Sequence, residues 1–140
     1  MIEIKVKKIK EISKTPQKNH SSDAGWDLFS VENIIIPKQS RAIISTGIST
    51  EIPEGYCALI WDRSSMGSKG FHRFAGVIDC SYRGEWKVIL CNFSQTNHEI
   101  KSGDKIAQAI IQKVEDVLFI EVDELSDTER GKKGFGSSGR

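Results

Sequence analysis

The chain has 140 residues, of which 38% are hydrophobic and 28% charged, and its formal net charge is +1. This length fits one domain with a real hydrophobic core. The near-neutral charge excludes a bulk attraction to nucleic acid or membranes, and no apolar run approaches membrane-spanning length. The first residues, MIEIKVKKIKEIS, alternate apolar and charged side chains, unlike a signal peptide. We therefore expect a cytoplasmic or otherwise intracellular protein.

The expected secondary structure is a series of short strands. Alternating or β-branched segments recur about every eight to twelve residues, with Gly, Pro, Asn and Ser between them, which indicates an all-β sandwich or barrel. In chain order, these segments are IEIKVKKI (2–9), NIIIP (33–37), RAIISTGISTEI (41–52), GYCALIW (55–61), EWKVILCNF (85–93), KIAQAIIQKV (105–114) and VLFIEVDEL (117–125). The 105–114 segment also fits a helix by length, but its β-branched residues favour a strand. The best helical candidate is SSMGSKG (64–70), with Ser64 or Ser65 as its cap.

Cysteines and histidines do not predict a disulfide framework or a metal centre. Cys57, Cys80 and Cys91 form no C-x-x-C pair, and an odd number of cysteines favours free thiols in a reducing compartment. The three histidines are far apart in sequence and lack the spacing of metal ligands. We therefore expect each histidine at the surface or in a loop.

Two polar loops are unusual for a plain sandwich. In DAGWDLFS (23–30), two aspartates flank a tryptophan, and the ordinary interpretation is the start of a strand with solvated acids. In DRSSMGSKG (62–70), an arginine, serines, glycines and a lysine share one loop. Backbone N–H groups and hydroxyls at a helical turn can cradle an anion, although Ser/Gly loops are common in proteins of every kind.

Two further segments carry polar groups next to apolar runs. In AGVIDCSYRGEWKV (75–88), apolar residues lead to Asp79, a turn and a second strand. This pattern predicts a β-hairpin with an acid on its inner edge, and an ordinary Asx-turn is the alternative. In GDKIAQAI (103–110), Gln108 stands inside an apolar strand, where its amide needs a hydrogen-bond partner.

The final segment, RGKKGFGSSGR (130–140), holds four glycines, four cations and one phenylalanine. Ordering such a segment should cost more conformational entropy than packing recovers. Taken alone, it is typical of a disordered terminus or a linker.

Together and in this order, AGWDL, RSSMGSKG, GVIDCSYRGE, GDKIAQ and RGKKGFGSSG resemble the five motifs of the homotrimeric dUTPase family. The resemblance covers residues 1–140 and includes STGIST and LSDTERG between the motifs. It implies an all-β, jelly-roll-like β-barrel over residues 1–129 and a flexible C-terminal arm over 130–140 that closes the active site. It also implies a homotrimer with arm exchange, in which each active site takes motifs from all three subunits.

The reaction implied by the resemblance is hydrolysis of dUTP to dUMP and pyrophosphate by attack of water on the α-phosphate. This reaction limits uracil incorporation into DNA and supplies dUMP for thymidylate synthesis. The implied general base is Asp79, and Tyr82 is the implied aromatic under the deoxyribose. Mg²⁺ is the implied cofactor, held through phosphate oxygens and water, with no direct protein ligand and Asp27 as a candidate helper. The implied partners are dUTP and other copies of the chain, with neither nucleic acid nor membrane.

The resemblance also assigns the other substrate contacts residue by residue. The third motif would read uracil. The first, second and fourth motifs of a neighbouring subunit would bind the triphosphate, and the fifth motif of the third subunit would close over the nucleotide. These contacts are Gly76, Val77, Ile78 and Lys87 for uracil; Arg63, Ser64, Ser65 and Gln108 for the triphosphate; and, in the arm, Arg130 for the γ-phosphate, Phe135 stacked on uracil, and Gly136, Ser137 and Ser138.

The chain departs from the family pattern at several positions without losing the implied catalytic residue. These departures bear on substrate affinity and fine specificity. They are Trp26 for tyrosine, Asp62 for the proline before the arginine of the second motif, Ser65 for glycine, Ser81 for a second acid, Trp86 for a smaller aliphatic residue, and Lys133 for glycine.

Two rival functions stay open. A dCTP deaminase of the same fold needs a glutamate on the strand after the hairpin, where this chain has Ile89, and Glu85 lies too early. A trimeric nucleotide-sensing regulator would bind a partner when the arm is open or closed. Trp61 and Trp86 would be its contacts if exposed, although burial in the core is expected for both.

Overall fold

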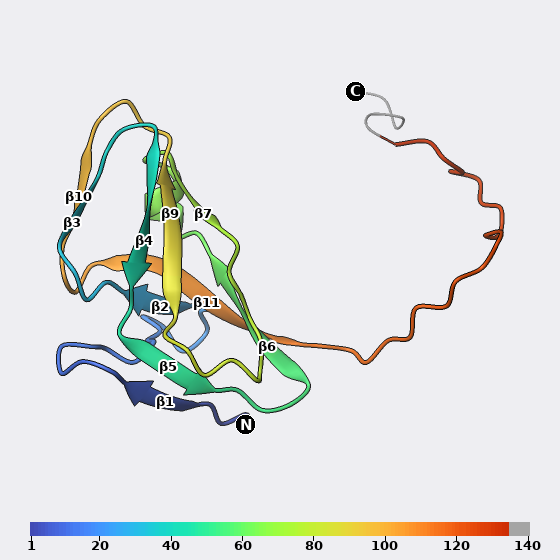
Figure 1. Ribbon diagram of the computed structural model, residues 1–140, viewed down its shortest axis with the longest axis horizontal. Coiled ribbons are helices and arrows are strands. Elements are labelled where there is room, and N and C mark those ends of the chain that lie inside the picture. The colour runs from blue at the N-terminus through green and yellow to red at the C-terminus, as the bar shows by residue number, and fades with distance from the viewer. Residues whose placement is uncertain (135–140) are drawn as a thin grey trace.

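The computed structural model describes residues 1–134 and is built almost entirely from β-strands (Figure 1). The only helix among these residues is α1 (Ser64–Gly67), which is too short to cross a membrane. The strands are β1 (Lys5–Lys8), β2 (Trp26–Phe29), β3 (Ile34–Ile36), β4 (Ser40–Ser45), β5 (Ile48–Glu51), β6 (Tyr56–Trp61), β7 (Phe71–Phe74), β8 (Val77–Ile78), β9 (Lys87–Asn92), β10 (His98–Ile100) and β11 (Lys105–Lys113). The predicted all-β class is confirmed, and the 105–114 segment is a strand as expected.

The strands pair antiparallel in four sheets, and one of them brings the polar motifs together. Its order is β2-β11-β6-β8, while the others are β4-β9-β7, β1-β5 and β3-β10. The long strand β11 lies between β2 and β6. In its register, Gln108 is opposite Asp27 on one side and Trp61 on the other. The first, second and fourth motifs therefore meet where β2, β11 and β6 lie side by side.

The core lies between the sheets and follows the alternation seen in the sequence. In β4, for example, Ile43 is 60% exposed while Ile44 is fully buried. Burying one such aliphatic side chain contributes about 1.5–3 kcal/mol. Trp86 is buried in this core, as expected. Trp61 is 47% exposed, contrary to expectation, because it ends β6 on the outer surface, where the guanidinium of Arg73 covers its ring at 5.0 Å.

Cysteines and histidines lie mostly as expected. All three cysteines are free, and Cys57 and Cys91 are buried. His20 and His72 are exposed, whereas His98 is half-buried, with its ring 4.7 Å from that of Phe71.

Two local expectations were wrong. The segment before Asp79 forms β8, but β8 pairs with β6 and not with the strand that follows it, so no regular hairpin ladder forms. The physical reason is that β9 is already paired on both edges, with β4 and β7. Neither Ser64 nor Ser65 caps α1: the cap position is Arg63, which makes no side-chain cap hydrogen bond.

The chain leaves the barrel after β11 and runs outward as an extended tail (Figure 1). The last backbone tie to the body is the hydrogen bond from Val114 N to Gly55 O at 2.8 Å. Residues 115–134 are all exposed, and the strand expected at 117–125 is not formed. This expectation was wrong for the isolated chain because, within residues 1–134, no strand lies beside the segment to pair with it.

Candidate active site

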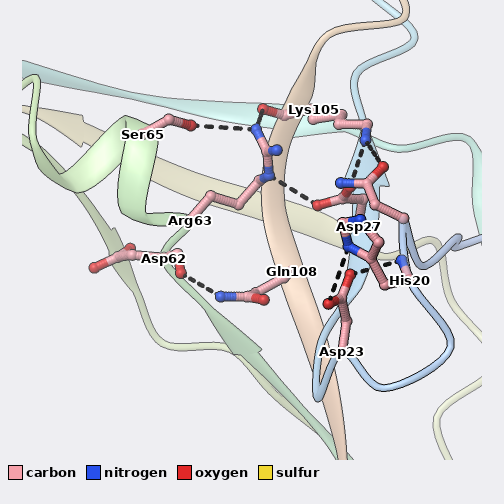
Figure 2. A network of polar contacts seen from close by, with 9 residues as sticks. His20, Asp23, Asp27, Asp62, Arg63, Ser65, Lys105 and Gln108 are labelled. Carbon is pink, nitrogen blue, oxygen red and sulfur yellow. Dashed lines mark hydrogen bonds and ion pairs between the residues drawn. The ribbon is translucent and has the colours of Figure 1, made fainter.

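Asp27 lies at the centre of a charged cluster between β2, β11 and the loop after β6 (Figure 2). Its side chain is only 11% exposed, and its two carboxylate oxygens lie 2.8 Å from Arg63 Nε and 2.7 Å from Lys105 Nζ. A carboxylate can be buried to this degree because both cations compensate it. Asp27 is therefore not the solvated acid that its loop indicated. It holds Arg63 in a fixed position.

The guanidinium of Arg63 is held at further points. Its Nη1 donates to Lys105 O at 3.3 Å and to Ser65 Oγ at 3.4 Å (Figure 2). Because Asp27 takes Nε, the guanidinium plane is restrained before any ligand arrives. Such a planar, permanently charged group is well suited to binding phosphate oxygens.

Gln108 has the hydrogen-bond partner that its position in an apolar strand required. Its Nε2 donates to the main-chain oxygen of Asp62 at 2.8 Å. Its Oε1 lies against Gly25, and a Cβ at that position would displace the end of the Gln108 side chain. One N–H of the amide remains for a ligand, since an amide NH₂ carries two donors.

These groups line a depression of about 410 Å³, which we call the Arg63 pocket. Its polar groups include a guanidinium, two serine hydroxyls and an amide, so it suits an anion such as a phosphate chain. Its lining residues are Asn19, Asp23, Ala24, Gly25, Asp27, Arg63, Ser64, Ser65 and Gln108. The acid at its rim, Asp23, accepts a hydrogen bond from His20 N, which lowers the pKa of the Asp23 carboxyl.

A second depression, the Asp79 pocket, has a volume of about 260 Å³. It combines apolar walls with one exposed carboxylate, that of Asp79. Its lining residues are Ile43, Phe74, Ala75, Gly76, Val77, Ile78, Asp79, Tyr82, Glu85, Lys87 and Ile89. Burial raises the pKa of the nearby Cys57 thiol, and the charges of Asp79 and Cys80 add to the effect. Cys57 is therefore less readily ionised than a free thiol.

The backbone of β8 forms one wall of the Asp79 pocket and has a free edge. Strand β8 pairs with β6 on one side only and is the last strand of its sheet. The chain bends into it through Ala75 and Gly76, which have positive φ angles of 57° and 104°. A Cβ at Gly76 would meet Ile60 at 3.0 Å, so glycine allows this close approach. Unpaired N–H and C=O groups on such an edge can hydrogen-bond a planar base as they would a partner strand.

Tyr82 lies beside Asp79 over the turn that follows β8. Its backbone N–H donates to Asp79 O at 3.1 Å, and its hydroxyl donates to Glu85 O at 3.1 Å. The ring passes so close to Gly84 that a Cβ there would collide with it. The turn and Gly84 together therefore hold the ring against the mouth of the Asp79 pocket.

The two pockets share no lining residue. Sequence-predicted contacts therefore form two groups in one chain, one around Arg63 and one around Asp79. Arg130 lies with neither group: it is exposed in the tail, where its Nε donates to Lys133 O at 3.1 Å. The predicted contacts Phe135, Gly136, Ser137 and Ser138 lie outside the described residues.

Sequence reasoning missed some residues of the site. Lys105 pairs with Asp27, a role that its place in an apolar strand does not indicate. Its position directly after the turn at 103–104 was the available signal. Glu85 was also missed as a structural residue: its Oε1 accepts from Gly47 N at 2.9 Å, which ties the Asp79 pocket to the turn between β4 and β5.

The fold and the two pockets define the class as an all-β protein with one depression suited to an anion and a separate depression that holds an exposed carboxylate. The dUTPase family model matches residues 11–139. The chain belongs to the dUTPase family.

Relatives match over nearly the full length. The chain is 43% identical to the deoxyuridine 5'-triphosphate nucleotidohydrolase of Paramecium bursaria Chlorella virus 1, with 99% of each chain covered. It is 44% identical to that of Clostridium tetani, with 98% of this chain and 97% of the relative covered.

Solved structures of dUTPases have the same fold. The Staphylococcus bacteriophage 80alpha dUTPase with dUPNHPP has a TM-score of 0.92 at 30% identity, and 99% of each chain is covered. A mutant dUTPase from phage phi11 of S. aureus, described for the coordination of a structural Mg(II) ion, has a TM-score of 0.82 at 27% identity. That match covers 89% of this chain and 99% of the phage chain. The expected barrel of the family is thereby confirmed.

Proposed function

We propose that this chain hydrolyses dUTP to dUMP and pyrophosphate, which limits uracil incorporation into DNA and supplies dUMP for thymidylate synthesis. Family membership and the names of the relatives support the reaction. The observation that carries it is the Asp79 pocket, where an exposed carboxylate lies beside an unpaired strand edge. An edge of this kind can read a base, and the carboxylate can accept a proton beside it.

In the proposed mechanism, Asp79 is the general base. Its carboxylate accepts a proton from the water that attacks the α-phosphorus, and a positioned base contributes about 10²–10⁴-fold to such a step. The backbone of Gly76, Val77 and Ile78 hydrogen-bonds the uracil edge. Lys87, at the start of β9, contacts uracil as well. Tyr82 packs under the deoxyribose.

The triphosphate binds in the Arg63 pocket in this proposal. Arg63, Ser64, Ser65 and Gln108 donate to the phosphate oxygens, and Asp27 keeps Arg63 oriented. The His, Cys, Asp and Glu residues of the described chain form no group of three or more that could hold a metal ion, while the donor set of the pocket suits phosphate oxygens. Bound with the triphosphate, Mg²⁺ would neutralise charge that develops on the phosphates. Both oxygens of Asp27 already pair with cations, so the geometry offers no support for a direct role of Asp27 toward the metal.

The homotrimer with shared sites is part of the same proposal. The tail carries an apolar run of exposed residues, among them Leu118 at 83% and Phe119 at 93% exposed. On the barrel, an apolar pocket of about 300 Å³ is lined by Ile2, Ile4, Val6, Thr15, Pro16, Trp26, Thr50, Trp86, Ala109 and Ile111. Thr50 Oγ1 and Trp86 Nε1 are buried without a hydrogen-bond partner among the described residues. We call this depression the Trp86 pocket. Segment 117–125 of a second copy would cover it and would supply the hydrogen-bond partners that Thr50 Oγ1 and Trp86 Nε1 lack.

This assembly predicts that charges in the apolar run break the trimer. Successive residues of a strand point to opposite faces, so the double substitution Leu118→Asp and Phe119→Asp places a charge on whichever face is buried. Sedimentation should show the wild-type chain at three times its 15.6 kDa mass and the variant at a smaller mass. The matched control adds two charges at Ser126 and Thr128, outside the apolar run, and should remain trimeric. A wild-type monomer, or a trimeric double variant, would contradict the exchange.

Sugar selection is expected to depend on Tyr82. Its ring is held by the hydroxyl contact to Glu85 O and by close packing on Gly84, and a rigid wall can reject an added 2'-hydroxyl. Tyr82→Ala should therefore narrow the ratio of kcat/KM for dUTP over UTP by about tenfold or more. Tyr82→Phe keeps the ring and should lose much less. An unchanged ratio in Tyr82→Ala would mean that Asp79 and the β8 backbone select the sugar instead.

The substrate itself is tested by pyrophosphate release from dUTP, dTTP, dCTP and UTP, with ammonia release from dCTP measured in parallel. Release from dUTP alone is the expected result. The deaminase alternative is disfavoured because Ile89 in the Asp79 pocket cannot transfer a proton, and because Glu85, which also lines the pocket, is engaged by the N–H of Gly47. Ammonia without pyrophosphate would overturn the proposed function.

A further inference from the structure

Asp62 stands directly before Arg63, and strand β7 binds both oxygens of its carboxylate. Asp62 Oδ2 lies 2.6 Å from His72 Nδ1, and Oδ1 accepts from the backbone N–H of Arg73 at 2.7 Å. Because a carboxylate can only accept, Nδ1 of His72 is the donor. Strand β7 belongs to the β4-β9-β7 sheet, whereas Asp62 follows β6 of the other large sheet. These two contacts therefore tie the start of the Arg63 loop to a second sheet.

The orientation of Asp62 explains how an acid is tolerated beside an anion pocket. Figure 2 shows its carboxylate pointing away from the Arg63–Asp27 pair, while its main-chain oxygen faces Gln108. The carboxylate is bound by β7, and Asp62 is not among the residues that line the Arg63 pocket. A charge that is directed outward and bound by a donor on each oxygen repels a bound phosphate less than a free one would.

The main-chain oxygen of Asp62 fixes the orientation of the Gln108 amide. It accepts from Nε2 at 2.8 Å, which places the NH₂ group on the loop side and Oε1 against Gly25. Phosphate oxygens only accept hydrogen bonds, so a triphosphate needs the NH₂ end of this amide. A flipped Gln108 would present its oxygen to the phosphates.

We propose that His72 is a positioning residue that acts through Asp62 on Gln108 and on the loop beginning at Arg63. This inference rests on the proposed triphosphate contacts of the Arg63 pocket. A proline at position 62 would restrain φ through its ring. Aspartate leaves φ free, and the two donors of β7 supply the restraint in its place.

The first test removes the imidazole. His72→Ala is expected to raise KM for dUTP about tenfold and to change kcat by less than about twofold, because one hydrogen bond to a charged group is lost outside the reacting centre. His72→Asn offers an amide N–H near the position of Nδ1 and should return KM toward the wild-type value. Arg41→Ala on β4 of the same sheet is the matched control and should leave KM unchanged.

The second test replaces the restraint. Trp61 lies in an extended strand, which suits the residue before a proline. Asp62→Pro introduced into His72→Ala should therefore lower the raised KM, whereas Asp62→Ala in the same background should not. The side-chain NH₂ resonances of Gln108 in the apo protein give a readout without substrate: they should shift in His72→Ala and return in the His72→Ala/Asp62→Pro variant.

Three outcomes would overturn the inference: an unchanged KM in His72→Ala, unchanged Gln108 resonances, or no rescue by either asparagine or proline. Gln108→Ala separates this failure from that of the proposed site. If Gln108→Ala raises KM and His72→Ala does not, the Arg63 pocket stands and the role of His72 fails. If neither variant raises KM, the assignment of the pocket to the triphosphate fails as well.

Discussion

Replacing Asp79 by asparagine is expected to lower kcat for dUTP by about two to four orders of magnitude, the usual share of a positioned general base. Asparagine has nearly the same shape but cannot accept the proton of the attacking water. The side chain of Asp79 is exposed and makes no hydrogen bond within residues 1–134, so folding should be unaffected. Pyrophosphate release under single-turnover conditions measures the loss directly.

Binding should survive this substitution. Because the backbone of β8 and the Arg63 pocket remain intact, calorimetry with a non-hydrolysable dUTP analogue should give an affinity close to that of the wild type. Asp116→Asn, in the exposed tail outside both pockets, is the matched control and should keep full turnover. Near-normal turnover in Asp79→Asn would show that another group is the base.

Deleting residues 130–140 is the second change with a large expected effect. In the closed site that we propose, Arg130 meets the γ-phosphate and Phe135 stacks on uracil. Stacking contributes about 1–3 kcal/mol and a charge-assisted hydrogen bond about 1.5–3 kcal/mol. Together they correspond to about 10²–10⁴-fold in rate if both act mainly in the transition state. Access of bulk water to the phosphates would add to the loss.

The truncation should leave the fold almost unchanged. Residues 130–134 are exposed, and their hydrogen bonds are local, such as Arg130 Nε to Lys133 O and Gly131 N to Thr128 O. Calorimetry should therefore show a melting temperature close to that of the full chain, and sedimentation should show the same assembly. A truncated chain with full activity would make the segment an ordinary terminus.

Much of the fold is predictable because the local sequence of a strand reflects which of its residues are buried. Alternation in 41–52 reflects one face packed on the core, whereas the β-branched run in 105–114 belongs to a central strand whose first half is buried on both faces. Both segments form strands as expected. Gln108 was identifiable for the same reason: an amide inside an apolar strand needs a partner. The Arg63 loop was recognisable because hydroxyls, glycines and an arginine are close in sequence.

Other features depend on contacts that sequence order does not contain. The apolar alternation at 117–125 has the chemistry of a strand, but a strand also needs a neighbour, and the described chain offers it none. The hairpin predicted at Asp79 does not form because β9 already pairs with β4 and with β7, and only the topology reveals this. Asp27 looked solvated because Arg63 and Lys105, its two cations, are distant in sequence.

Asp62 shows the same limit at a single residue. As a substitution for proline next to an anion pocket, it had no explanation from sequence, because its two donors come from another sheet. The structure shows that the carboxylate of Asp62 connects the Arg63 loop to β7. This contact gives His72 a role that no motif indicated.

Subunit mixing tests the central claim most directly, which is that each site combines Asp79 of one chain with the arm of another. Full-length Asp79→Asn protein and the chain lacking 130–140 should each be nearly inactive. After 1:1 subunit exchange, about a quarter of the sites should join an intact Asp79 to an intact arm from a different subunit, so activity should return to about a quarter of the wild-type value. Mixtures that exchange subunits, as mass measurement of tagged chains can verify, yet stay as inactive as their parents would contradict the shared site.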